Sequence, residues 1–249
     1  MRVNSGIVLI NAEPFTTKNF KQNIYLGSPG NALRILSDLA YDELVVLNVD
    51  STLTDHFFCT LQSIAIGCRK PLIYSGQISN ETEALRVIAC GYERIGIQTL
   101  VTHENNRLSD LSSLVGKQSV TLFLDILTEK SGEILHKSGR NLQALLTELL
   151  ANGTLQNIGE ILLNNITLNG SYNQEQPWNE LANICSLVSD QVNIGYCGGI
   201  SEGREISKLE NIGFDSVVIM SAASLDHSKN TKLLNEHAVG EYRKAAQRN

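Results

Sequence analysis

Several features that would restrict the protein to a particular class are missing from this sequence. No apolar run approaches the ~20 residues that a helix needs to cross a bilayer, and the N-terminus lacks the apolar stretch of a secretory signal. The five cysteines are scattered and none forms a Cys-x-x-Cys pair, so neither a disulfide framework nor a zinc site is expected. The net charge of −6 offers no basic excess for nucleic acid or an anionic membrane. We therefore expect a cytoplasmic globular protein without metal or other cofactor.

Short apolar runs, rich in β-branched residues, alternate with longer amphipathic stretches along all 249 residues. Runs of this length are typical of buried parallel strands, and eight strand–helix repeats are the number that closes a barrel. An open, doubly wound sheet is the structural alternative, although no Gly-x-Gly-x-x-Gly motif follows the first run. We predict a single (β/α)8 barrel over residues 1–249. The expected strands are 6–10, 44–49, 72–74, 95–97, 120–126, 161–163, 192–196 and 216–220, and clear helices are expected at 31–41, 81–90, 141–151 and 202–211.

An internal repeat divides the chain into two similar halves. The segment 74–79 (Tyr-Ser-Gly-Gln-Ile-Ser) resembles the segment 196–201 (Tyr-Cys-Gly-Gly-Ile-Ser), which lies 122 residues further on. At the same spacing Gly91 corresponds to Gly213, and Thr99 corresponds to Ser221. The repeat predicts two half-barrels, approximately 1–116 and 117–249.

Two turns after the seventh and eighth expected strands are candidates for a phosphate site. Gly198 and Gly199 let backbone N–H groups approach an anion closely, and Ser221 with Ala222 opens a short helix and adds a hydroxyl. Two ordinary turns are the alternative, but loops after strands 7 and 8 commonly bind phosphate in this fold. The corresponding first-half site is Gly76 with Thr99. There Gln77 replaces a glycine, and its side chain is expected to crowd the approach.

Asp125 is the candidate proton-transfer residue, because it ends an apolar run where a barrel presents its catalytic groups. A carboxylate in such surroundings is unfavourable unless it is used or paired. Its counterpart in the first half is Val8, which has no proton to transfer. Amides are expected to dominate the rest of this face, and the histidines are expected on the surface. The residues concerned are Asn48, Asn164, Asn165 and Asn169, and His56, His103, His136, His227 and His237.

Four charged residues stand at or just before the starts of strands 1, 2, 4 and 6. They are Arg2, Glu43, Arg94 and Glu160, which places two cations and two anions around the opposite end of one barrel. Ordinary charge at strand edges, with a role in stability, is the alternative and on geometry alone the better one.

The sequence around these residues resembles the HisF family, the cyclase subunit of imidazole glycerol phosphate synthase. The resemblance rests on both glycine turns and on four segments, and it extends to about residue 224. The segments are Arg2-Val3, 25–32 (Tyr-Leu-Gly-Ser-Pro-Gly-Asn-Ala), 42–47 (Asp-Glu-Leu-Val-Val-Leu) and 159–163 (Gly-Glu-Ile-Leu-Leu). It implies a duplicated barrel that docks a HisH-like glutaminase on its bottom face and passes ammonia upward to a bisphosphate substrate.

The resemblance also implies roles for individual residues. The family's gate of four charged residues falls on Arg2, Glu43, Arg94 and Glu160, and an acidic position that contacts the glutaminase falls on Glu93. The strand-5 catalytic aspartate falls on Asp125. The phosphate-binding positions fall on Gly198, Gly199 and Ser221, with Thr99 at the second phosphate.

The departures from the family pattern concentrate at the mouth of the barrel. The strand-1 catalytic aspartate is Val8 here, the strand-2 aspartate is Asn48, and a substrate-holding loop lysine falls near Thr16. The signature Asp-Arg-Asp-Gly-Thr has become Thr-Leu-Asn-Gly-Ser at 167–171, and a Gly-Gly-Gly has become Ser-Gly-Gln at 75–77. Losing one of two proton-transfer groups lowers a rate by about 10²–10⁴.

A second HisF-like branch, linked to acetamidino-sugar formation in surface polysaccharide synthesis, also lacks the strand-1 aspartate. That branch works with a HisH-like glutaminase and a separate sugar amidotransferase. The sequence thus leaves three hypotheses: an ammonia-delivering subunit for sugar amidination, a diverged cyclase of histidine biosynthesis, and a non-catalytic scaffold that binds a partner or a phosphorylated small molecule.

Overall fold

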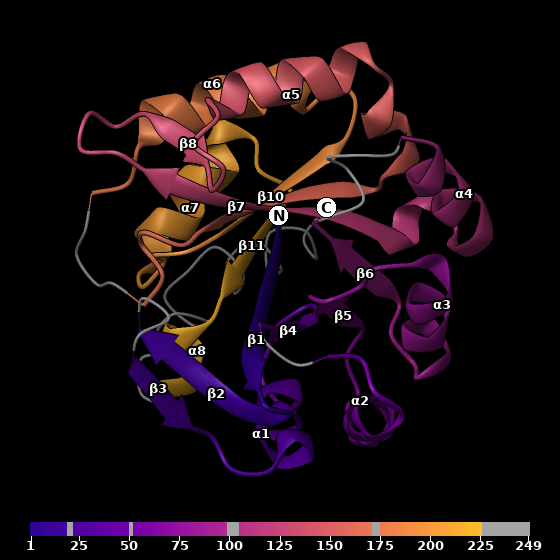
Figure 1. Cartoon of the computed structure of the whole chain (residues 1–249). Coiled ribbons are helices and arrows are strands. Elements are labelled where there is room, and N and C mark those ends of the chain that lie inside the picture. The colour runs from indigo at the N-terminus through magenta and orange to yellow at the C-terminus, as the bar shows by residue number, and fades with distance from the viewer. Residues whose placement is uncertain (19–21, 50–51, 99–104, 171–174, 226–249) are drawn as a thin grey trace, which may run out of the picture.

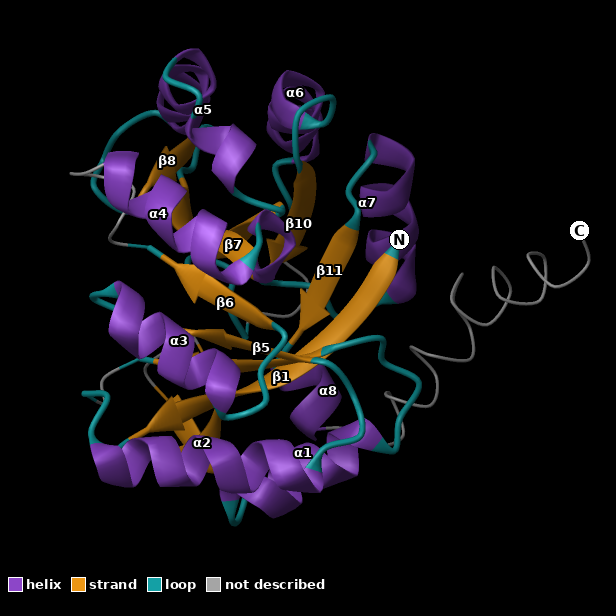
Figure 2. Ribbon diagram, turned by 90° about the vertical axis from the view of Figure 1, so that its right-hand side faces the viewer, coloured by secondary structure: helices purple, strands orange, loops and turns teal. Residues whose placement is uncertain are grey.

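Eight parallel strands close into a barrel in the computed structural model, which describes residues 1–18, 22–49, 52–98, 105–170 and 175–225 (Figures 1 and 2). The last strand pairs with the first, so the sheet has no open edge, and the predicted (β/α)8 barrel is confirmed over the open sheet. In spatial order the strands are β1 (Arg2–Ile10), β4 (Leu44–Asn48), β5 (Leu72–Ser75), β6 (Arg94–Ile97), β7 (Val120–Thr128), β9 (Glu160–Asn165), β10 (Asn193–Cys197) and β11 (Ser216–Ile219).

Helices cover the outside of the barrel (Figure 1). They begin where the sequence offers start signals: Ser28 precedes Pro29 at the first helix, and the Asn80 side chain accepts the Glu83 N–H at the third. None of the described helices is long and apolar enough to span a bilayer. The helices are α1 (Pro29–Ser37), α2 (Asp55–Gly67), α3 (Glu81–Ala89), α4 (Asn105–Val115), α5 (Leu142–Ala151), α6 (Trp178–Val188), α7 (Gly203–Ile212) and α8 (Ser221–Leu225), with 3₁₀ turns at Lys117–Ser119 and Thr154–Asn157.

Antiparallel extensions continue the first strand of each half beyond the barrel. β2 (Glu13–Lys18) folds back on β1 and pairs with β3 (Gln22–Tyr25), and β8 (Ile134–His136) folds back on β7. None of these three segments is among the strands expected from the sequence. Asn11 and Ala12 form the turn between β1 and β2, with φ values of 51° and 62°. Such positive φ values usually occur at glycine, which is absent from this turn, so the sequence gives no clear turn signal here.

Side chains alternate between the two faces of each barrel strand and form two separate apolar clusters. The larger cluster lies between the sheet and the helices. The smaller one fills the inside of the barrel, and we call it the inner cluster: Val8, Val45, Leu47, Ile73, Phe123, Leu162, Cys197 and Val218, with Ile10 and Met220 packed against it. The eight barrel strands run in the same direction, so their amino ends form one face of the barrel, the floor, and their carboxyl ends form the other, the mouth.

Candidate functional site

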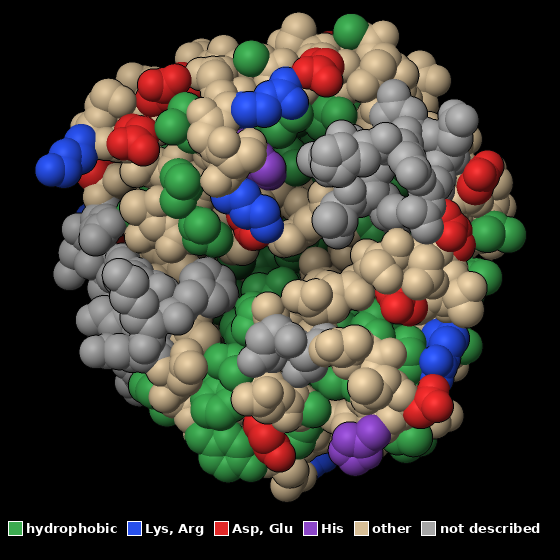
Figure 3. Space-filling view, in the orientation of Figure 1, with side chains coloured by type: hydrophobic (Ala, Val, Ile, Leu, Met, Phe, Trp, Pro, Cys, Tyr) green, Lys and Arg blue, Asp and Glu red, His purple; other side chains and the backbone are tan. Residues whose placement is uncertain are grey.

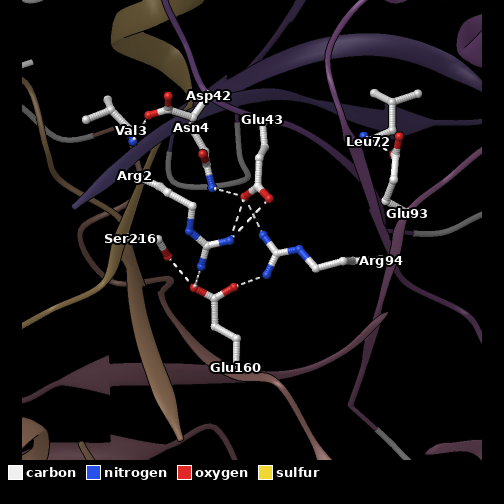
Figure 4. A network of polar contacts seen from close by, with 10 residues as sticks. All are labelled: Arg2, Val3, Asn4, Asp42, Glu43, Leu72, Glu93, Arg94, Glu160 and Ser216. Carbon is white, nitrogen blue, oxygen red and sulfur yellow. Dashed lines mark hydrogen bonds and ion pairs between the residues drawn. The ribbon is translucent and has the colours of Figure 1, made fainter. Parts of the chain in front are cut away.

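The floor of the barrel carries the four charged residues that the sequence singled out. Arg2 and Glu160 begin β1 and β9, Arg94 begins β6, and Glu43 directly precedes β4. Arg2 Nη1 lies 3.2 Å from Glu43 Oε1, and Arg2 Nη2 lies 2.8 Å from Glu160 Oε1. Arg94 forms ion pairs with the same two carboxylates. Each guanidinium therefore bridges both carboxylates, and the four side chains form a closed ring, called the charged ring below (Figure 4).

Further hydrogen bonds fix the two carboxylates of the charged ring. Ser216 Oγ donates to Glu160 at 2.5 Å, and Asn4 Nδ2 donates to Glu43 at 2.9 Å. The Glu160 side chain is 3% exposed and that of Arg94 10%, whereas Arg2 is 34% exposed on the outer side. Buried charges are tolerated only when they are paired in this way. The ion pairs of the charged ring therefore join four strand starts at the floor of the barrel.

Glu93 was predicted to contact a partner, and it is engaged within the chain. Its Oε2 accepts the Leu72 N–H at 2.6 Å, at the start of β5 (Figure 4). Asp215 accepts the Ile194 N–H at 2.8 Å in the same way in the second half. Glu93 therefore satisfies a strand terminus, although its exposed position leaves it accessible from the floor.

Above the charged ring the barrel is apolar and densely filled. Gly96 provides the space for the Phe123 ring, since a Cβ on Gly96 would lie 2.4 Å from Phe123 Cδ2. The face shown in Figure 3 is hollowed at its centre, and hydrophobic side chains line the hollow. The region between ring and mouth therefore offers little that could hold a charged molecule and favours a small neutral one.

Asp125 lies at the mouth, as predicted, and all its partners are hydrogen-bond donors. Asn164 Nδ2 donates to Oδ1 at 2.8 Å, while Gln98 Nε2 and Lys137 Nζ lie 3.2 Å and 2.7 Å from Oδ2. Within the described barrel strands it is the one acid near a carboxyl end, since Glu160 stands at a strand start. Burial, with a smaller contribution from the negative charge of Asp125, raises the pKa of the neighbouring Cys197 thiol to about 12.

The strand register makes Val8 the first-half counterpart of Asp125. Val8 pairs with Leu47 as Asp125 pairs with Asn164, and its side chain is 1% exposed within the inner cluster. The prediction that Asn48 and Asn165 contribute amides to the mouth is wrong. Both side chains point to the outer face of the sheet, where they donate to Tyr74 Oη and Tyr196 Oη at 2.9 Å.

Lys137 is the residue that sequence reasoning missed. The antiparallel β7–β8 pairing places it beside Asp125, and its backbone N–H donates to Asp125 O at 2.8 Å. The signal was the Ser131-Gly132 turn between two apolar runs, which is typical of a hairpin. His136 is also not a surface loop residue: it lies half-buried in β8, where burial and then the charge of Lys137 lower its pKa.

The predicted phosphate turn is assembled but narrow. Gly198 (φ +119°), Gly199 (φ +70°) and Ser221 surround a hollow of about 10 Å³, together with Asn169 and Met220. That is about the volume one water molecule needs, so a phosphate group fits only if neighbouring side chains move aside. Ala222 is buried in α8 and lines no part of this hollow.

The first-half turn keeps the backbone shape without the second glycine. Gly76 has φ +121° and Gln77 has φ +58°, close to the values of the second-half pair. The Gln77 side chain is exposed and its amide lies 3.4 Å from Val49 O. The predicted second-phosphate residue Thr99 lies outside the described residues, as do His103, Ser171, His227 and His237. Within the described part, no three His, Cys, Asp or Glu side chains group as metal ligands would.

Comparisons with known proteins agree with this architecture. A relative from Leptospira borgpetersenii, named "Putative imidazole glycerol phosphate synthase subunit HisF", is 28% identical over 225 residues, covering 86% of this chain and 77% of the relative. A protein of Pseudomonas aeruginosa that carries the subunit name hisF2 is 26% identical over 231 residues, 88% of each chain. The subunit HisF of Clavibacter michiganensis is 23% identical over 210 residues, covering 82% of this chain and 77% of the relative. The family model described as "Histidine biosynthesis protein" matches residues 11–231, and the chain therefore belongs to this family as a HisF-like barrel.

Proposed function

We propose that this chain is the barrel subunit of a cytoplasmic glutamine amidotransferase complex, in which it docks a HisH-like glutaminase at the floor and conducts ammonia to the mouth. The observation that carries the proposal is the closed charged ring. Four side chains at the starts of four strands, far apart in sequence, meet at the floor with compensating charges (Figure 4). A ring that only stabilised the floor would not need ionisable groups, because apolar residues of similar volume are often equally stable there.

The mouth supports delivery of ammonia rather than cyclisation. Val8 supplies no proton-transfer group, and Asp125 is held by Lys137, Gln98 and Asn164. A second HisF-like branch with this loss supplies ammonia for acetamidino-sugar formation in surface polysaccharide synthesis, so we propose the same use here. A separate sugar amidotransferase would then receive ammonia at the mouth, and a phosphorylated small molecule would bind at Gly198, Gly199 and Ser221.

Docking is tested by mixing the chain with its cognate glutaminase. We expect a complex at micromolar concentration and faster glutamine hydrolysis. Absence of a complex at that concentration would overturn the proposal. Glu43→Gln, which opens one corner of the charged ring, should preserve docking but change the rate of ammonia transfer to an acceptor. Glu148→Gln removes an exposed carboxylate from α5 and serves as the matched control, because its pair with Arg140 lies on the surface.

The same measurements separate conduction from a scaffold role. A scaffold would bind the glutaminase equally well with Glu43 or Gln at this position and would show no change in transfer. Folding of each variant is checked by its thermal unfolding midpoint, so that loss of transfer is not mistaken for loss of structure. A barrel that docks yet is indifferent to every change in the ring fits the scaffold hypothesis.

A cyclase of histidine biosynthesis is the second candidate, and one observation favours it: Asp125 and the Gly198–Gly199 turn both lie at the mouth. Ammonium and the bisphosphate substrate should then give turnover without any partner, and Asp125→Asn should reduce it by about 10²–10⁴. Asp55→Asn, at a 91% exposed side chain, is the matched control. Absence of product above background ends this candidate.

A further inference from the structure

Four polar side chains form one connected group on the wall of the mouth, called the mouth cluster below: Asp125, Asn164, Gln98 and Lys137. Asp125 Oδ1 accepts from Asn164 Nδ2 at 2.8 Å, and its Oδ2 accepts from Lys137 Nζ at 2.7 Å. Lys137 also donates to Gln98 Oε1 at 3.1 Å. Because the charges of Asp125 and Lys137 compensate one another, the mouth cluster as a whole is neutral.

The first half of the barrel has no equivalent of the mouth cluster. Val8 and Phe15 pair in register in the β1–β2 hairpin, where the β7–β8 hairpin has Asp125 and Lys137. The Lys137 backbone N–H donates to Asp125 O at 2.8 Å. One hairpin therefore closes on an apolar pair and the other on an ion pair, and the fold itself does not require the polar groups.

Asn164 has a buried acceptor without a partner among the described residues. The residue is 3% exposed, and its Oδ1 receives no hydrogen bond. Buried acceptors are almost always paired, so a donor is missing here. The Nδ2 atom points to Asp125 on β7, and in the planar carboxamide Oδ1 lies on the other side. It therefore faces β10, where Cys197 pairs with Asn164 in register.

The β10 side of Asn164 leads to the phosphate turn. Cys197 lines the same small hollow as Gly198, Gly199 and Ser221. Neighbouring strands lie about 4.8 Å apart, so a ligand whose phosphate group lies at the turn has its next carbon atoms beside Asn164. A hydroxyl on one of these carbons can donate to Asn164 Oδ1, whereas an ionised carboxylate has no proton to donate.

We propose that the mouth binds a phosphomonoester with a neutral polyol chain, the phosphate lying at Gly198 and Gly199 and a hydroxyl donating to Asn164 Oδ1. The proposal rests on the proposed function, in which a phosphorylated small molecule binds at this turn. Asn164 is then the residue that determines specificity, and Lys137 is a positioning residue that neutralises Asp125. A second acidic group on the ligand would be repelled by the Asp125 charge, so this ligand differs from the bisphosphate that the HisF resemblance implies.

Binding is measured by NMR titration of the isotopically labelled barrel alone, with the backbone amides of Gly198 and Gly199 and the side-chain amide of Asn164 as reporters. Three probes share the phosphate group and the length of the chain: glycerol 3-phosphate, propyl phosphate, which lacks the hydroxyls, and 3-phosphoglycerate, which carries a carboxylate. We expect glycerol 3-phosphate to bind about tenfold more tightly than propyl phosphate, and 3-phosphoglycerate to bind more weakly than glycerol 3-phosphate.

Two variants separate specificity from positioning. Asn164→Leu should abolish the difference between glycerol 3-phosphate and propyl phosphate. Lys137→Met should weaken binding of all three probes, because it leaves the Asp125 carboxylate without its cation, but should keep that difference. Asn183→Leu, at an exposed residue of α6, is the matched control and should change neither. Thermal unfolding midpoints show whether each variant is folded.

The titrations of the unmodified barrel can overturn the proposal without any variant. Equal affinity for glycerol 3-phosphate and propyl phosphate would show that no hydroxyl is recognised. Tighter binding of 3-phosphoglycerate would show that the mouth cluster binds an acid. Absence of binding by every probe would remove the phosphate turn and the polyol site together. Because no glutaminase is present, each of these results is distinguishable from a failure to dock.

Discussion

The first and second halves of the barrel share their hydrogen-bonded framework but not their reactive groups. Asn48 donates to Tyr74 in the first half and Asn165 donates to Tyr196 in the second, both at 2.9 Å. Glu83 accepts the Ser79 N–H at 2.8 Å, and Glu205 accepts the Ser201 N–H at 2.7 Å. These pairs fix the same strand ends and the same turns in both halves, as an internal repeat predicts.

The candidate catalytic carboxylate and the turn with two glycines both lie in the second half. The first-half residue that corresponds to Asp125 is Val8, and the one that corresponds to Gly199 is Gln77. The comparison indicates that the framework is required for the barrel itself, whereas each carboxylate or open turn at the mouth can be lost without loss of fold. The charged ring, in contrast, draws residues from both halves, so it is not subject to this asymmetry.

The largest expected difference between equivalent positions is at the two ring carboxylates. Glu160→Ala should lower the free energy of unfolding by about 3–5 kcal/mol, because it leaves buried Arg94 without one partner and Ser216 without its acceptor. Glu43→Ala should have a smaller effect, since Glu43 is 13% exposed, against 3% for Glu160, and water can reach the vacated position. Urea unfolding measures both.

The control for these two variants is an exposed ion pair. Glu148→Ala, which removes the partner of Arg140, should change stability by no more than about 0.5 kcal/mol. If both variants lowered the free energy of unfolding equally, burial of the carboxylate would not determine how much each one contributes to stability. Losses as small as that of Glu148→Ala would mean that the ring contributes no more than surface charge.

The next largest difference is expected at the two buried tyrosines. Tyr196 Oη donates to Gln176 Oε1 at 2.7 Å and accepts from Asn165. Tyr74 Oη accepts in the same way from Asn48. Tyr196→Phe should therefore cost about 2 kcal/mol and Tyr74→Phe about 1 kcal/mol in urea unfolding. The reverse order would show that the Gln176 contact, which is confined to the second half, adds no stability.

The fold could be predicted because the apolar periodicity is strong and the strand ends are marked. Seven of the eight expected strands differ from the observed bounds by no more than two residues, while β1 begins four residues earlier, at Arg2. The antiparallel extensions could not be predicted as readily. β2 and β3 lack a glycine turn, and their pairing depends on the end of β1, which is a tertiary contact.

Site residues whose position follows from the order of the strands were predicted correctly. Residues whose position depends on the direction of the side chain were predicted less well. The charged ring followed from four strand starts, since strand starts must meet at one end of a barrel. Asn48 and Asn165 were misplaced because a shift of one residue along a strand reverses the face. Lys137 was missed because only the hairpin register brings it to Asp125.

A smaller effect is expected from Cys197, whose counterpart in the first half is Ser75. Folding raises the pKa of the Cys197 thiol to about 12, so above about pH 8.5 the unfolded chain loses this proton while the native state keeps it. The contribution of this thiol to stability is therefore fully present below about pH 8.5, and the free energy of unfolding falls as the pH rises above that value. Cys197→Ser should make the decline between about pH 9 and 10 shallower by about 1 kcal/mol in urea unfolding. Cys59→Ser, at an exposed cysteine, should not.

The smallest expected effect tests whether the first-half turn is strained by its departure from the repeat. Gln77 has φ +58°, which is unfavourable for a residue with a Cβ, whereas Gly199 holds φ +70° freely. Gln77→Gly should relieve this strain, but glycine also gives the unfolded chain more entropy, which opposes folding. The net effect should be a rise of about 0.5 kcal/mol in the free energy of unfolding. Gln77→Ala keeps the Cβ and loses the weak contact with Val49 O, so it should give no gain. If Gln77→Gly and Gln77→Ala had the same effect on the free energy of unfolding, the backbone at Gln77 would not be strained.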